Sequence, residues 1–214
     1  MACPLGRGRG EDVAVSFIGG GGASLLDGSG HQVWRRQVGG NAWSVGTLAG
    51  PIPLVAVDDG SDGISLFDAV GNPTREAAAS GGSDSLVGGD LLGTGEDQLF
   101  GATTTESAGQ WIRYFDRHGT KLWEVPSDSA YAALDPTMAV GLILGRRMLV
   151  HGDAGGDFRF YDASGKRIGQ WQNPERDARS FCLLPRPDSG EDLVVYSSSG
   201  VTAYRAIWLE STHR

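Results

Sequence analysis

Three aspartates end a repeated Gly-Glu-Asp motif, and carboxylates are the groups with which a glycosidase does its chemistry. They are Asp12, Asp97 and Asp192, each at the start of an apolar segment. In a ring of repeats they would surround a central funnel, but hydrolysis needs two carboxyl groups whose surroundings split their pKa values. Recurrence at one repeat position predicts similar surroundings. We therefore favour a structural role at a turn, with catalysis as the alternative.

Other candidate chemistry has a structural explanation. The acidic segment 58–63 has the composition of a cation loop, but an EF-hand loop starting at Asp58 needs an oxygen ligand where Gly60 stands and glutamate where Ala69 stands. We interpret it as a hairpin turn. The histidines have no metal-ligand spacing, and we expect no cofactor; they are His31, His118, His151 and His213. Two free cysteines, Cys3 and Cys182, are expected to be buried thiols.

The tryptophans fall into two groups. One group recurs at a single position of the repeat, which predicts packing between neighbouring sheets; it comprises Trp34, Trp123 and Trp171. The other group breaks the repeat and comprises Trp43, Trp111 and Trp208. The packing of the repeat does not explain why these positions hold tryptophan, and binding of a partner is another reason. The second group, together with the three aspartates, therefore forms our set of candidate partner-binding residues.

Two sequence anchors recur with a period of about 45 residues, and a fixed period is typical of repeat architectures. The first is an Asp-x-x-Gly turn after a short apolar strand, at Asp27, Asp68, Asp116 and Asp162, with a degenerate copy at Arg205. The second is a glycine shortly before an apolar strand, at Gly10, Gly50, Gly95, Gly145 and Gly190. The anchors predict four full copies and one partial copy.

Each copy is predicted to hold four strands. The first, such as 54–57, is apolar on both faces, and we expect it to be the innermost and buried. The second alternates, with apolar residues four and two positions before the turn residue, at Ala23/Leu25, Ile64/Leu66, Ile112/Tyr114, Phe158/Phe160 and Val201/Ala203. At the turn, aspartate can bond the backbone two residues on and glycine can take positive φ. The third strand carries the recurring tryptophan, and the fourth, such as 42–48, is the weakest.

Radial repetition of four-stranded units predicts an all-β single domain over 1–214, a β-propeller. Its units are 10–49, 50–94, 95–144, 145–189, and 190–214 plus 1–9. Met1–Leu5 is similar to 181–184, and both precede a Gly-Glu-Asp motif. We therefore expect 1–5 to be the outer strand of the last blade, closing five blades. The alternative is a fragment of a six- to eight-bladed propeller, whose open edge should self-associate.

The repeat resembles known families. Residues 89–101 resemble the FG-GAP (VCBS, integrin α-type) propeller repeat, and Asp116–Trp123 resembles the PQQ-type repeat. The first resemblance implies a calcium loop, in which Asp90, Gly93 and Gly95 match. The usual oxygen-ligand positions hold Leu92, Thr94 and Gln98, so we do not expect calcium. The second implies a quinone-dependent dehydrogenase, whose dedicated catalytic aspartates have no counterpart here.

Composition narrows the function. With 34 glycines among 214 residues and a net charge of −8, the chain reads as a turn-rich β protein without a nucleic-acid or anionic-membrane partner. No apolar run is long enough for a membrane span, and the start lacks a signal peptide, so we expect a soluble and, if the chain is complete, cytoplasmic protein. We predict a non-catalytic protein-interaction scaffold. The alternatives are a carbohydrate-binding propeller, and a glycosidase or quinone-dependent enzyme.

Overall fold

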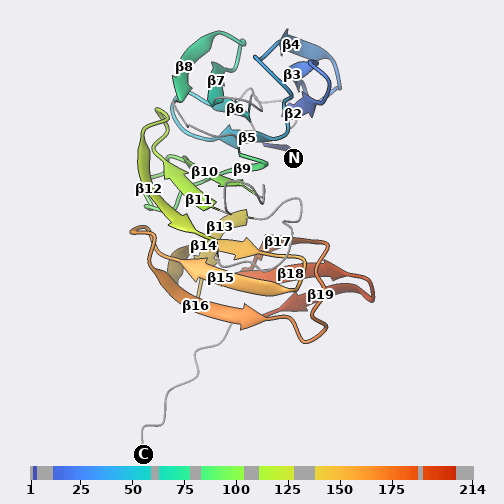
Figure 1. Cartoon of the computed structure of the whole chain (residues 1–214), viewed down its shortest axis with the longest axis vertical. Coiled ribbons are helices and arrows are strands. Elements are labelled where there is room, and N and C mark those ends of the chain that lie inside the picture. The colour runs from blue at the N-terminus through green and yellow to red at the C-terminus, as the bar shows by residue number, and fades with distance from the viewer. Residues whose placement is uncertain are drawn as a thin grey trace, which may run out of the picture.

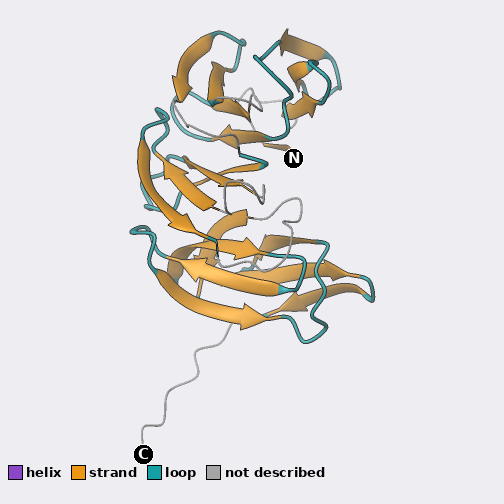
Figure 2. Ribbon diagram, viewed as in Figure 1, coloured by secondary structure: helices purple, strands orange, loops and turns teal. Residues whose placement is uncertain are grey.

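The chain is an all-β protein in the part that the computed structural model describes, which is residues 2–3, 12–58, 63–77, 83–103, 111–127, 138–187 and 190–205. Every regular element there is a strand (Figure 2), as the sequence predicts. Consequently these residues contain no helix that could cross a membrane.

The strands form five antiparallel sheets in which chain neighbours pair, and we number the sheets 1 to 5. Sheet 1 contains β1 (Ala2–Cys3), β2 (Asp12–Phe17), β3 (Gly22–Leu26) and β4 (Gln32–Arg36). Sheet 2 contains β5 (Val45–Leu48), β6 (Leu54–Asp58), β7 (Ile64–Asp68) and β8 (Pro73–Ala77). Sheet 3 contains β9 (Ser85–Gly89), β10 (Gln98–Thr103), β11 (Trp111–Phe115) and β12 (Lys121–Pro126).

The last two sheets differ in strand number. Sheet 4 contains β13 (Met138–Ile143), β14 (Arg146–Gly152), β15 (Asp157–Tyr161) and β16 (Arg167–Gln172). Sheet 5 contains β17 (Ser180–Pro185), β18 (Glu191–Ser197) and β19 (Gly200–Tyr204). The sheets follow one another along an arc whose ends are sheets 1 and 5 (Figure 1), which is a propeller-like arrangement.

The turn chemistry predicted from the Asp-x-x-Gly anchor is confirmed. At Asp116, Oδ1 accepts the N–H of His118 at 2.9 Å and of Thr120 at 2.8 Å, while the Gly119 N–H donates to the Asp116 carbonyl at 3.0 Å. Gly119 has φ 80°, in the region that favours glycine. The turns at Asp27, Asp68 and Asp162 repeat this pattern.

The hydrophobic core consists of four layers, one between each pair of consecutive sheets. The alternating positions of the third strand supply much of it. Four residues before the turn aspartate, the relative exposures are 0%, 1%, 0% and 0% for Ala23, Ile64, Ile112 and Phe158. The predicted half-buried strand is therefore buried on this face wherever a following sheet covers it.

The innermost strand was predicted wrongly. The strands that pack against one another from sheet to sheet are β5, β9, β13 and β17, which are the first of each sheet and the ones whose sequence looked weakest. Glycine explains both facts, because Gly46, Gly88 and Gly141 allow these strands to approach closely and also weaken the strand pattern. Each sheet therefore begins one strand before the repeat unit, and the strongly apolar strand comes second.

The placement of the N-terminal strand also needs correction. Ala2–Cys3 pairs with β2, with Ala2 opposite Val13, and so belongs to sheet 1 and not to the last blade. Its likeness to 181–184 is nevertheless structural, because β17 precedes and pairs with β18 in the same way. Pairing with the nearest strand along the chain needs only a short connection, which accounts for the outcome.

The recurring tryptophans pack between sheets, as predicted. Trp34 lies against Gly71 and its ring centroid is 5.6 Å from that of Phe67 in sheet 2. Trp123 lies against Gly165 of sheet 4 and donates its indole N–H to the Ala163 carbonyl at 3.0 Å. Each indole therefore packs on the Asp-x-x-Gly turn of the following sheet.

A buried charged cluster lies at the end of β14. Arg159 Nη1 is 3.0 Å from Asp153 Oδ2, and both side chains are buried. His151 beside them is 3% exposed. Burial, reinforced by the Arg159 guanidinium and opposed by Asp153, lowers the pKa of His151 to about 4. His151 is therefore neutral in the folded protein at neutral pH.

This histidine should make the protein acid-sensitive in a defined window. Its pKa is about 6.5 when unfolded, so the unfolded chain takes up the proton first and stability falls as the pH drops from about 6.5 towards 4. We expect a loss of about 2 kcal/mol in the free energy of unfolding between pH 7 and pH 4.5. Urea denaturation at the two pH values measures it. The His151→Gln variant should lose much less, and an equal loss in both proteins would refute the assignment.

Candidate functional site

The candidate residues that the structure describes do not gather at one place. Trp43 is 49% exposed between β4 and β5, whereas Trp111 is half-buried at the start of β11. Asp12 begins β2 and pairs across to Cys3. Trp208 lies outside the described residues. The structure thus assigns no shared site to this set.

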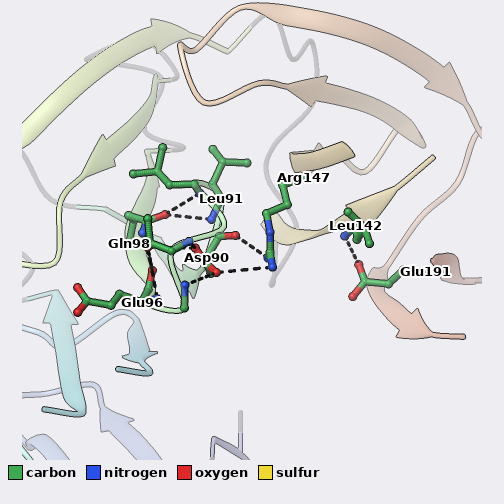
Figure 3. Close-up of polar contacts among 10 residues, drawn as sticks. Asp90, Leu91, Glu96, Gln98, Leu142, Arg147 and Glu191 are labelled. Atoms are coloured by element: carbon green, nitrogen blue, oxygen red, sulfur yellow. Dashed lines mark hydrogen bonds and ion pairs between the residues drawn. The ribbon is translucent and has the colours of Figure 1, made fainter. Parts of the chain in front are cut away.

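The Gly-Glu-Asp motif ties sheets together. Asp97 Oδ2 accepts the N–H of Ala49 at 2.7 Å, and the Asp97 N–H donates back to the Ala49 carbonyl at 3.0 Å. Burial raises the pKa of Asp97, against the effect of the Ala49 N–H. In sheet 5 the glutamate of the motif makes the corresponding contact, because Glu191 Oε2 accepts the Leu142 N–H at 2.8 Å (Figure 3). Each contact joins the start of a second strand to the preceding sheet's first strand or to the residue that follows it.

Asp192 is occupied by ion pairs. Its Oδ1 lies 3.1 Å from Arg186 Nη1 and 3.4 Å from Arg205 Nε. Slight desolvation is outweighed by these two guanidinium groups, which lower the pKa of Asp192. The three repeated aspartates therefore have different surroundings, contrary to our expectation, and they lie in three different sheets.

The loop that resembles a calcium site is held by internal hydrogen bonds. Asp90 accepts the N–H groups of Thr94 and Gly95 at 2.9 Å each, and Arg147 of sheet 4 is 3.6 Å from its Oδ2 (Figure 3). Together these groups outweigh desolvation and lower the pKa of Asp90. Among the described residues, no group of three or more acidic, histidine or cysteine side chains could hold a metal ion.

A groove of about 510 Å³ lies between sheets 4 and 5. Its walls are mainly apolar and come from all four strands of sheet 4 and from β18 and β19; they include Ile143, Met148, Phe160, Trp171, Leu193 and Tyr204. The ring centroids of Trp171 and Tyr204 are 4.6 Å apart. The polar groups of the lining are those of Arg146, Gln170, Glu191 and Arg205. Such a cavity accepts apolar side chains and orients them with a few polar contacts.

The groove exists where sheet 5 departs from the other sheets. In sheets 2 and 4 the Asp-x-x-Gly turn leads into a fourth strand, and the indole of the preceding sheet packs on that turn. In sheet 5 Arg205 takes the place of the turn aspartate, and no strand of the described residues pairs with the outer edge of β19. Trp171 therefore packs on Tyr204 and stays half-buried.

Ile168 marks the exposed side of the groove. It lies at the bulge of β16, between Arg167 and Gly169, and is 38% exposed. Leu122 occupies the same bulge position of β12 in sheet 3 and is 50% exposed, but it is not part of the groove. Sequence reasoning missed the groove, although the loss of the turn aspartate at Arg205 was the signal that pointed to this end of the chain.

Solved structures share this fold. BBS1N in complex with ARL6DN superposes with a TM-score of 0.65 at 12% identity, covering 90% of this chain and 59% of that chain. Chaetomium thermophilum Raptor gives 0.61 at 17% identity, covering 93% and 19%. A protein of unknown function from Bacteroides caccae gives 0.58 at 13% identity, covering 94% and 69%.

These likenesses show the propeller-like fold alone. The chain spans less than two thirds of the length of the BBS1N chain. No protein-family model and no curated protein matches the sequence. The resemblance to FG-GAP and PQQ-type repeats remains a prediction.

Proposed function

We propose that this protein is a non-catalytic interaction scaffold that binds an extended segment of a protein partner in the groove between sheets 4 and 5. The observation that carries the proposal is an apolar groove directly beside the outer edge of β19, with which no described strand pairs. An edge strand offers backbone donors and acceptors to an added strand, and side-chain pockets give specificity.

The chemistry of the groove defines the segment. The partner segment would pair with β19 in the place that a fourth strand takes in the other sheets. Every second side chain of an added strand points to the same face, so apolar residues at alternate positions would reach Trp171 and Tyr204. The likeness in fold to BBS1N, which was solved in complex with ARL6DN, supports a protein ligand.

Selection from a displayed library of random linear peptides on the immobilised protein tests the proposal. We expect enriched peptides with alternating apolar residues. Ile168→Glu should weaken their binding at least about tenfold, because the peptide would desolvate the new carboxylate. The measurement is the Kd of a synthetic copy of an enriched peptide by fluorescence anisotropy.

Leu122→Glu is the matched control, because Leu122 has the same bulge position and similar exposure outside the groove. This variant should bind the peptide as tightly as the unsubstituted protein does. The proposal fails if no peptide is enriched, or if the enriched peptides bind the Ile168→Glu and Leu122→Glu variants equally.

A further inference from the structure

Four core layers between five sheets leave two outer faces, one on sheet 5 and one on sheet 1. The outer face of sheet 5 carries an apolar patch. Register places Val194 opposite both Cys182 and Ala203, and Tyr196 opposite Val201, so these residues share one face. Val201 is 70% exposed and Tyr196 47%. Cys182 is also exposed, against the expectation of a buried thiol.

Comparison with the other sheets shows that the described part of the chain leaves this face uncovered. Val201 stands four residues before the turn position, as Ala23, Ile64, Ile112 and Phe158 do in sheets 1 to 4. Those four are at most 1% exposed because the following sheet covers them, whereas Val201 is 70% exposed. The sequence therefore builds a packing face on sheet 5 that no described residue covers.

The outer face of sheet 1 corresponds to the face that sheet 2 packs against sheet 1. Val13 and Val15 hold the register positions that Val55 and Val57 hold in sheet 2, where they face the preceding sheet. Val55 and Val57 are fully buried, but Val13 and Val15 are only half-buried. Phe17 on the same face is 38% exposed, with the Arg35 guanidinium 5.1 Å from its ring centroid.

The inter-sheet tie is also incomplete at this face. In sheets 3 and 5 an acid of the Gly-Glu-Asp motif accepts an N–H from the preceding sheet's first strand. Asp12 ends the same motif in sheet 1, which no described sheet precedes, and its carboxylate makes no hydrogen bond to another described residue. The outer face of sheet 1 thus carries the acid of the motif without the N–H donor that a preceding sheet supplies elsewhere.

We propose that the outer face of sheet 5 binds the outer face of sheet 1 of a second copy of this chain. The outer face of sheet 5 corresponds to the face that each of sheets 1 to 4 packs on the following sheet. The outer face of sheet 1 corresponds to the face that each of sheets 2 to 5 packs on the preceding sheet. Together they would form a core layer like the four within the molecule. Within one chain they lie at opposite ends of the arc (Figure 1), so a second copy supplies the mate. Such a head-to-tail contact is heterologous, and it leaves the groove between sheets 4 and 5 in place.

Molar mass by light scattering over a range of protein concentrations tests this contact. The unsubstituted protein should form species larger than one chain. Val201→Glu and Phe17→Glu should each be monomeric, because each replaces an apolar side chain of the contact with a charged one that the contact would desolvate. An equimolar mixture of the two variants should give a dimer, since one intact face of each kind remains. Val33→Glu, 45% exposed at the bulge of β4, is the control and should associate normally.

The outcomes separate the alternatives. A monomeric unsubstituted protein at all concentrations, or a Phe17→Glu variant that still associates, would overturn the proposal. A mixture that stays monomeric would do the same. If Val201→Glu fails to fold by circular dichroism, Ala203→Glu on the same face replaces it. Labelling of Cys182 in a Cys3→Ser background gives a second readout, which should slow as association covers the thiol.

Discussion

Replacing Gly88 by alanine should lower the free energy of unfolding by about 3 kcal/mol or more. A Cβ atom there would overlap the carbonyl oxygen of Thr47 in the neighbouring sheet. Because the overlapping atom belongs to the backbone and cannot rotate away, β9 and β5 would have to move apart. We expect a fall of about 10 °C in Tm, measured by thermal unfolding.

Gly39→Ala is the control for this prediction. Gly39 has no neighbouring atom near the position of a Cβ and is not in the positive-φ region. Its substitution should change stability by less than about 0.5 kcal/mol. If Gly88→Ala proves equally mild, the close approach of the first strands is not what fixes the spacing of the sheets.

Replacing Asp153 by alanine should cost about 3–5 kcal/mol of folding free energy. The Asp153 and Arg159 side chains are 1% and 6% exposed, so the substitution would remove a buried carboxylate that pairs with the Arg159 guanidinium. Urea denaturation at pH 7 measures the loss. The double variant Asp153→Ala/Arg159→Met removes that cation and should recover part of the stability.

The exposed pair of Lys121 and Glu124 provides the comparison. Lys121 Nζ is 3.2 Å from Glu124 Oε2, but the lysine is 44% exposed. Lys121→Ala should therefore cost no more than about 1 kcal/mol. A similar cost for Asp153→Ala would mean that the buried pair contributes no more than a surface one.

Local chemistry accounts for what could be predicted from the sequence. The turn at Asp116 forms because one carboxylate reaches two nearby N–H groups and Gly119 tolerates positive φ, and both are properties of a few adjacent residues. The alternation of Ile112 and Tyr114 likewise requires only the two-residue period of a strand. These features determined the strands, the period of the repeat and the packing role of Trp123.

Contacts between distant residues decided the rest. Which strand lies innermost depends on the close approach of Gly88 to Thr47, and glycine leaves a weak strand signal. The groove at Trp171 arises because no described strand pairs with the outer edge of β19, and Val201 is exposed because no sheet in the described part of the chain follows sheet 5. Ile64 and Phe158 occupy the same repeat position as Val201, and both are buried. The sequence by itself determined that each sheet has an apolar face; only the tertiary structure decided which faces find a neighbour, because burial depends on what packs there and not on the strand alone.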